Sequence, residues 1–443
     1  AALRRRGRPA RRREVVVSSA TAPARAKSAR ASTSGTPAAH GGGWWGRFES
    51  PVTTYYLLVG VTVALVVFGL IMVLSASAIV SIQETEGASA YSIFISQAVF
   101  ATIGAVALIV ASRLPMRSWR ALAFPILAVG VTLQVLVLLT GENVNGNQNW
   151  LRVGPITVQP SEIIKLGLVL VGALVLSKKR QHLHSLAHVV VPYLVPIVAV
   201  AVGAVVLGHD LGTVLILGAI VAGVLFAAGI PLRWFAFAGV PFVAGVAWFV
   251  LSSANRLSRF DVWLGRDTDE FGTYRQPLHG RYALADGGWL GVGLGQSREK
   301  WGLLSEPHND FIFAIIGEEL GLPGSLGVLA LFAALALACY RLVSRTDDFF
   351  VRVATAGIMT WIIIQAVINI GAVINLLPVI GVPLPLVSSG GSALITTMFA
   401  LGILLSFARA EPGCAEALSA RPSAIRRTLA VLPDVGRRRR ART

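Results

Sequence analysis

The sequence predicts an all-α polytopic membrane protein of about ten transmembrane helices, and three observations support this fold class. First, the 443 residues are 54% hydrophobic and 14% charged, with a mean hydropathy of +0.69, whereas soluble domains carry about 25% charged residues. Second, apolar runs of about 20 residues, long enough to cross a bilayer, recur along the chain. Third, the formal charge of +17 is concentrated at the two ends. This composition argues against a soluble enzyme and against a disordered protein.

The two ends are predicted to be basic tails. Residues 1–49 have a net charge of +9 and residues 409–443 a net charge of +6. The charges stand among Ala, Ser, Pro and Gly, a composition that favours disorder. We expect no cleavable signal peptide, because no apolar stretch follows the basic residues before Tyr55. Tails of this kind would face anionic lipid at the cytoplasmic surface, so the charge does not predict a nucleic-acid partner.

Residues 50–408 are the predicted membrane domain. The ten expected helices cover residues 55–80, 93–112, 121–140, 162–177, 189–207, 211–230, 234–251, 310–342, 353–377 and 392–408. Lys and Arg cluster in the short loops after the second, fourth, sixth and eighth helices. The positive-inside rule therefore places these loops and both termini in the cytoplasm. The same topology puts one large charged loop, residues 252–309, outside the cell, where we expect function.

A polar cluster marks the start of the fourth helix: Gln159, Ser161, Glu162 and Lys165. Pro160 suits a first helical turn, and the helix dipole favours a Glu there. The three- and four-residue spacing puts Ser161, Glu162 and Lys165 on one helix face. Charged residues at bilayer depth are costly, and their default interpretation is functional. Two interpretations stay open: a structural ion pair or snorkelling lysine, or a lysine that holds a phosphate.

A second cluster, with His308 and Asp310, lies where the large loop re-enters the membrane. Asp310 stands at the predicted start of the eighth helix and is followed directly by apolar residues. It is either a helix cap or a general base whose pKa burial would raise and the helix N-terminus would lower. Further along this helix we expect Glu318 and Glu319 to make structural hydrogen bonds, and a break at residues 321–324.

Two further segments complete the candidate site. Asp210 precedes the sixth helix and is either a cap for Thr213 or a group that positions a cation or substrate. Residues 377–392 contain three prolines and three glycines, and they end in hydroxyl residues that include Ser388 and Ser392. Irregular backbone at membrane depth must be buried or line a cavity. It is either a structural turn or a source of amides and hydroxyls for a pyrophosphate or a sugar.

Other chemistries have little support in the sequence. No P-loop or dinucleotide-binding motif is present, and Gly-rich residues 291–295 alone are a weak signal. Cys339 and Cys414 are too few for a disulfide framework and lack metal-ligand spacing. A divalent cation such as Mg²⁺ could screen a pyrophosphate near Asp210 or Glu162, but no ligand cluster predicts a tight site.

Taken together, these motifs resemble the SEDS family (shape, elongation, division, sporulation), and its cell-division branch more than its elongation branch. The resemblance runs from Tyr55 to Phe407. It rests on Gln-Pro-Ser-Glu at 159–162 with Lys165, on His-Asn-Asp-Phe-Ile-Phe-Ala at 308–314, and on Pro-Leu-Pro at 383–385 with the Ser-rich turn that follows.

The resemblance implies a peptidoglycan glycosyltransferase of the plasma membrane at the division septum. Its substrates would be lipid II and the growing glycan strand, with Asp310 as general base and with Glu162 and Lys165 as the helix-four pair. We expect Gln159, Ser161, Asp210, His308, Ser388 and Ser392 to contact substrate. The implied partners are a class B penicillin-binding protein transpeptidase and other divisome proteins, as well as membrane lipid.

Two other classes of function stay open. A lipid II flippase would also use a polar-lined cavity, but transporters carry paired broken helices in their two halves, and the sequence shows one strongly broken region, at residues 378–391. A non-catalytic divisome scaffold would depend on the tails and not on Asp310.

Overall fold

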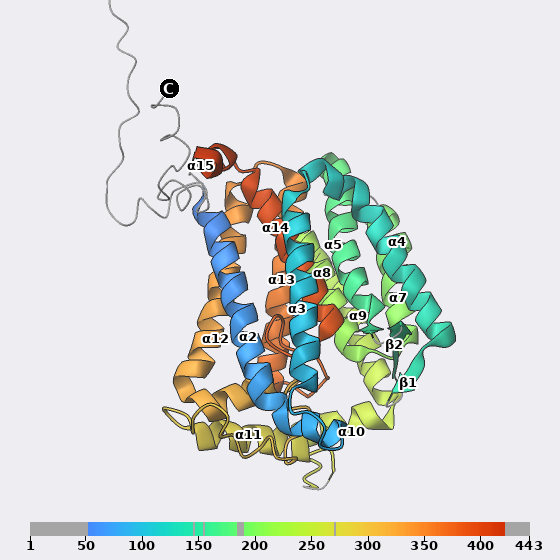
Figure 1. The fold of residues 1–443 in the computed structure, drawn as a ribbon. Coiled ribbons are helices and arrows are strands. Elements are labelled where there is room, and N and C mark those ends of the chain that lie inside the picture. Colours follow the sequence, from blue (N-terminus) through green and yellow to red (C-terminus); the bar gives the residue numbers. More distant parts are fainter. Residues whose placement is uncertain (1–51, 145–146, 154–155, 184–189, 270–271, 421–443) are drawn as a thin grey trace, which may run out of the picture. The chain divides into compact units, whose positions relative to one another are not determined.

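The computed structural model describes residues 52–420, except residues 145–146, 154–155, 184–189 and 270–271 (Figure 1). The predicted tail at residues 1–49 lies outside the described residues, as does the predicted tail at 409–443 beyond residue 420. Within the described part, each of the ten predicted apolar segments is helical. The predicted all-α membrane fold is therefore confirmed, and the count of ten spanning helices and their orientation stay predictions.

Eight helices of the described part are long and apolar enough to cross a membrane. They are α2 (Thr53–Glu84), α3 (Ser92–Arg113), α4 (Met116–Thr140), α5 (Pro160–Lys178), α9 (Leu232–Leu251), α12 (Ile312–Arg345), α13 (Phe349–Val373) and α14 (Gly391–Arg409). Two further apolar helices are shorter. The first is a π-helical segment, η2 (Val190–Val198), which continues into α7 (Ala199–Leu207), and the second is α8 (Leu211–Ala227).

The helices pack in close pairs, with α3 on α14, α4 on α5, α2 on α12 and α8 on α13 (Figure 1). Glycines allow two of these approaches. A Cβ on Gly402 of α14 would lie 2.5 Å from the Leu108 carbonyl oxygen of α3, and a Cβ on Gly167 of α5 would lie 2.6 Å from Leu127 Cα of α4. Larger side chains at these positions would push the paired helices apart. In α5, 83% of the most apolar 18-residue window is buried, so this helix lies in the core of the bundle.

The segment between the third and fourth predicted helices, residues 141–160, contains a small sheet. Its strands are β1 (Glu142–Val144), β2 (Asn147–Val153) and β3 (Ile156–Val158), paired antiparallel in the order β1-β2-β3. Leu151 faces Val158 across β2 and β3 in the register. The sheet ends directly before Gln159, the N-cap residue of α5, and so leads into the polar cluster.

The large loop between α9 and α12 is partly helical. It contains α10 (Ala254–Trp263) and α11 (Arg275–Gly287). Two short elements lie elsewhere, η1 (Arg180–His182) and α15 (Cys414–Ala420). The structure starts α12 at Ile312 and not at the predicted residue 310, so Asp310 belongs to the loop.

The first part of α12 is tied to the large loop by buried carboxylates. Glu319 forms an ion pair with Lys300 at 3.0 Å and accepts from the Ser75 hydroxyl at 2.6 Å. Glu318 accepts from the Ser297 hydroxyl at 2.5 Å and from the Arg298 amide at 2.6 Å. The predicted structural hydrogen bonds of this pair are confirmed.

The predicted break in α12 is confirmed as well. Gly321 has φ 66° and ψ −157°, which is not helical. A helix of 34 residues would be about 51 Å long, far more than the roughly 30 Å hydrocarbon core needs. The break divides α12 into a buried first part, residues 312–320, and a second part, residues 322–345, that is long enough to cross the bilayer alone.

Candidate active site

A cavity of about 1000 Å³ lies among α5, α8, α10, α13 and the irregular segment that follows α13. Six of the nine predicted site residues line it: Gln159, Glu162, Lys165, Asp210, Asp310 and Ser392. They come from four separate stretches of the sequence and converge at this one cavity. Ser161, His308 and Ser388 are absent from its lining.

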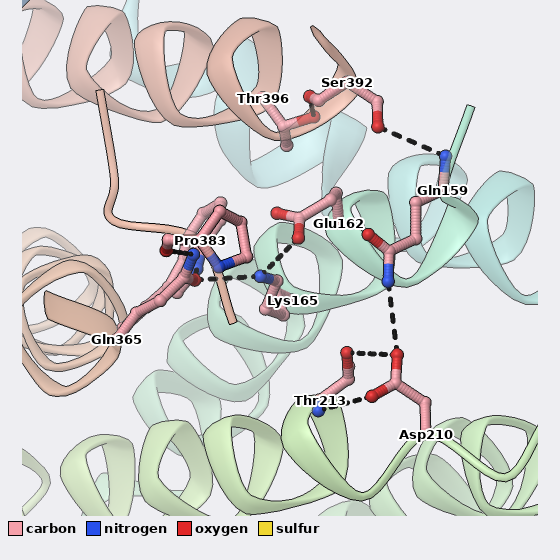
Figure 2. A network of polar contacts seen from close by, with 10 residues as sticks. Gln159, Glu162, Lys165, Asp210, Thr213, Gln365, Pro383, Ser392 and Thr396 are labelled. Atoms are coloured by element: carbon pink, nitrogen blue, oxygen red, sulfur yellow. Dashed lines mark hydrogen bonds and ion pairs between the residues drawn. The ribbon is translucent and has the colours of Figure 1, made fainter. Parts of the chain in front are cut away.

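On α5, Lys165 is fully buried, with 1% of its surface exposed. Its ammonium nitrogen lies 2.7 Å from Glu162 Oε1 and 3.0 Å from Gln365 Oε1 (Figure 2). It also lies 5.1 Å from the centre of the Trp361 ring. Gln365 itself donates to the Pro383 carbonyl oxygen. The cation is therefore enclosed by a carboxylate, an amide and an aromatic face, which corresponds to the structural ion pair of the two interpretations.

Asp210 caps α8, as one of its two interpretations predicts. Its Oδ1 accepts from the Thr213 amide at 2.9 Å, and its Oδ2 accepts from the Thr213 hydroxyl at 2.7 Å (Figure 2). The same Oδ2 accepts from Gln159 Nε2 at 3.2 Å, and the Gln159 amide donates to the Ser392 hydroxyl at 3.2 Å. One carboxylate thus connects the starts of α5, α8 and α14.

Asp310 is not a helix cap. The N-cap residue of α12 is Phe311, and no side chain caps this helix. The backbone carbonyl of Asp310 accepts from Asn369 Nδ2 at 2.8 Å, which anchors the residue to α13, while the carboxylate faces the cavity. A Cβ added at Gly381 would lie 3.5 Å from Asp310 Oδ2 and 3.8 Å from Arg259 Nη1. The carboxylate and the guanidinium therefore both lie beside Gly381.

The surroundings of Asp310 make its carboxyl group a weaker acid than an ordinary Asp. Burial, and to a smaller extent the charge of Glu306, raise the pKa of Asp310 to about 7, and the Arg259 guanidinium opposes this increase. A carboxyl group with this pKa exchanges its proton near neutral pH, which is the property that a general base requires.

The irregular segment after α13 is held by hydrogen bonds to the residues before α12. The Ser388 hydroxyl donates to the Asn309 carbonyl oxygen at 2.7 Å, and the Ser389 amide donates to the His308 carbonyl oxygen at 2.9 Å. Asn369 Nδ2 also donates to the Val382 carbonyl oxygen. In this arrangement Ser388 and the backbone of His308 position the Asp310 loop. The Ser161 hydroxyl is buried without a hydrogen-bond partner among the described residues.

The cavity lining also includes polar residues that the sequence analysis did not single out, among them Arg256, Arg259 and Gln365. Arg256 lies 3.9 Å from the centre of the Phe249 ring and donates to the His209 carbonyl oxygen at 3.3 Å. Arg259 donates to the Val379 carbonyl oxygen at 3.4 Å. Their spacing of three residues on a short helix of the charged loop is the signal that could have indicated a basic face.

Metal-ligating side chains do not cluster in the described part of the chain. Among these residues, no group of three or more His, Cys, Asp or Glu side chains could hold a metal ion. Within the same residues, neither Arg256 nor Arg259 has a carboxylate within 4.0 Å, so their charges face the cavity without an ion-pair partner.

The fold and the cavity define a polytopic membrane protein with a charged site built from the large loop and the ends of its helices. The chain belongs to the FtsW/RodA/SpoVE family, described as "Cell cycle protein", whose profile matches residues 55–412.

Named relatives agree with this membership. The probable peptidoglycan glycosyltransferase FtsW of Mycobacterium tuberculosis is 39% identical over 389 residues, which cover 87% of this chain and 73% of the relative. Stage V sporulation protein E of Bacillus subtilis is 36% identical over 357 residues, which cover 80% of this chain and 96% of the relative.

Solved structures agree as well. A chain of a peptidoglycan synthase complex that coordinates polymerization and crosslinking superposes with a TM-score of 0.64 at 26% identity, covering 80% of this chain and 96% of that one. The rod shape determining protein RodA of Thermus thermophilus superposes with a TM-score of 0.59 at 26% identity, with the same coverage of both chains.

Proposed function

We propose that this protein is a peptidoglycan glycosyltransferase that polymerises lipid II into β-1,4 glycan strands. The observation that carries the proposal is the half-buried carboxylate of Asp310, with a pKa of about 7, beside a guanidinium on a cavity of about 1000 Å³. Relatives named as peptidoglycan glycosyltransferases support the reaction class.

Asp310 acts as the general base of a single displacement. Its carboxylate takes the proton of the acceptor GlcNAc 4-hydroxyl as that oxygen attacks the anomeric carbon of the donor MurNAc. The bond from that carbon to undecaprenyl pyrophosphate breaks, and the pyrophosphate leaves with the electron pair. Attack from the opposite face converts the α-linked donor into a β-1,4 bond. The lipid-linked donor supplies the energy, so no nucleotide is needed.

The arginines of α10 bind the leaving group and neutralise its negative charge. Lys165 was the sequence candidate for this role, but its charge is already matched by Glu162 at 2.7 Å. Arg256 and Arg259 are half-buried on the same cavity. A guanidinium binds phosphate oxygens in a planar, bidentate manner. We assign the pyrophosphate contact chiefly to Arg259. The Glu162–Lys165 pair helps to shape the cavity wall.

Further parts of the proposal concern the assembly. A peptidoglycan synthase complex among the structural neighbours supports a transpeptidase partner of the class B penicillin-binding protein type. We further propose action at the division septum together with other divisome proteins, which the relatives named FtsW support. The predicted topology, with both tails in the cytoplasm, places the cavity on the outer side of the membrane, where lipid II is polymerised.

The proposal is tested by Asp310→Asn in the purified full-length protein, reconstituted with lipid II and its transpeptidase partner. We expect loss of glycan polymerisation with lipid II binding retained, because the amide cannot accept the hydroxyl proton. Asp286→Asn is the matched control, since Asp286 is an exposed acid of the same large loop, on α11. Polymerisation by Asp310→Asn at the control rate would contradict the assignment of Asp310 as general base. Absence of polymerisation in the parent and in the control would contradict the enzyme proposal and favour a flippase or a scaffold.

A further inference from the structure

The loop that covers the break in α12 exposes large apolar side chains and buries a pair of charged ones. We call residues 289–303 the apolar loop; they lie outside the spanning helices, in the large loop between α9 and α12. Its large apolar side chains point outward: Trp289 is 80% exposed, Leu290 85% and Leu294 55%. Trp301 and Leu303 are exposed as well.

Two of the three charged residues of the apolar loop point the other way, and the third, Arg298, is exposed. Glu299 and Lys300 are buried. Lys300 pairs with Glu319 of α12 at 3.0 Å, and Glu299 lies 2.7 Å from the His279 ring of α11. A loop in water would be expected to expose its charges and bury its tryptophans, because charges are costly to bury and apolar surface is costly to expose. The opposite arrangement indicates an apolar environment outside the protein.

Backbone hydrogen bonds fix the height of this loop along α12. The Val292 amide donates to the Glu318 carbonyl oxygen at 2.9 Å, and the Gly293 amide donates to that of Glu319 at 3.0 Å. The Leu322 amide in turn donates to the Gly288 carbonyl oxygen at 3.2 Å. A Cβ on Gly321 would lie 2.9 Å from the Trp289 carbonyl carbon. Trp289 and Leu290 therefore lie at the point where the membrane-crossing part of α12 begins.

The exposed surface of α12 continues from this point. Leu322, Leu326 and Leu329 are all exposed, and their spacing of four and three residues places them on one helix face. This face belongs to a candidate membrane span and begins at Leu322, whose amide is hydrogen-bonded to Gly288, the residue directly before the apolar loop. Tryptophan is enriched at the boundary between lipid and water, where its ring is apolar and its N–H reaches polar groups. An exposed Trp and Leu pair at the end of a span matches that boundary.

We propose that the apolar loop is a membrane-interface anchor, which inserts Trp289, Leu290 and Leu294 into the outer edge of the bilayer beside α12. The loop also holds Ser297 and Lys300 against the first part of α12, which leads to Asp310. Lipid contact at this loop would thereby steady the approach to the cavity. The inference does not depend on the reaction that the cavity performs.

Spin labels on single cysteines test this placement in the full-length protein in lipid nanodiscs. Cys339→Ala and Cys414→Ala, both at buried positions, remove the natural thiols of the sequence. Labels are then placed by Leu290→Cys and Leu294→Cys. Leu326→Cys on α12 is the lipid-facing reference, and Thr268→Cys, an exposed position of the same large loop, is the water-facing reference. The readout is the ratio of accessibility to oxygen, which concentrates in hydrocarbon, over accessibility to a water-soluble nickel chelate.

We expect the ratio at both loop positions to shift away from the Thr268→Cys value and toward the Leu326→Cys value. A ratio equal to that of Thr268→Cys at both positions would overturn the proposal and leave the surface to a protein partner. Labels that are shielded from both reagents would overturn it as well, because they would indicate a protein contact. The thermal unfolding transition of each labelled protein, compared with that of the parent, verifies that it is folded, whichever ratio is found.

Discussion

Two acid–base pairs face the same cavity and differ in how completely they are satisfied. Glu162 and Lys165 lie within α5 at 2.7 Å, with 4% and 1% of their side chains exposed, and Gln365 and Trp361 complete the surroundings of the lysine. Asp310 and Arg259 come from two distant parts of the large loop, are half-buried, and both lie beside Gly381 without forming an ion pair within 4.0 Å. The two charges of the first pair neutralise each other and stabilise the fold. The second keeps charge and a titratable proton available for a substrate.

The largest effect of a single substitution is expected at the Glu162–Lys165 pair. Lys165→Met removes the cation and leaves the Glu162 carboxylate buried without its partner. We expect the free energy of unfolding to fall by about 3–5 kcal/mol, the usual cost of an orphaned buried charge. Denaturant titration of the protein in detergent measures it. The double variant Glu162→Gln, Lys165→Met should recover most of the loss; equal stability of the single variant and the parent would show that the pair is not structural.

Substitution of Arg259, which faces Asp310 in the cavity, should reduce activity without reducing stability. Arg259→Ala removes a charge-assisted contact of about 1.5–3 kcal/mol, so we expect kcat/KM for lipid II to fall about 10- to 100-fold with the unfolding transition unchanged. Arg266→Ala is the control, since Arg266 is 72% exposed on the same loop and pairs with Asp261 at 3.6 Å. A stability loss without an effect on kcat/KM would assign Arg259 to the fold.

The smallest loss of stability and activity is expected at Asp210, which connects the starts of α5 and α8. Asp210→Ala removes the cap of α8 and the contact to Gln159, so we expect a stability loss of about 1 kcal/mol and a moderate loss of polymerisation. Asp348→Ala is the matched control, because Asp348 caps α13 through the Phe350 amide and is absent from the cavity lining. If both variants lose stability and activity in the same proportion, Asp210 has no role beyond capping.

Much of this arrangement follows from local sequence, and the rest depends on tertiary contacts. The length of the apolar runs predicts the helices, Pro160 marks the start of α5, and the Gly-Leu-Pro-Gly stretch predicts the break in α12. The three- and four-residue spacing within α5 already puts Glu162 beside Lys165. These are contacts within one element.

The meeting of Asp310 with Arg259 cannot be predicted in this way. The two residues are 51 positions apart, and the fold of α10, α11 and the apolar loop between them decides where they meet. His308 and Ser388 illustrate the same limit. Their residue types suggest substrate contacts, but the structure places them in the hydrogen bonds that join two loops, and their roles toward substrate stay predictions.

The central claim, that Asp310 is a general base poised near neutrality, is tested most directly by the pH dependence of kcat/KM for polymerisation. The reactive form is the carboxylate, so with a pKa of about 7 the rate should rise about tenfold per pH unit below pH 7 and level off above it. Melting temperatures at each pH control for unfolding. A rate that is constant from about pH 5 to 8, where an ordinary Asp with a pKa of about 4 would already be ionised, would contradict the account.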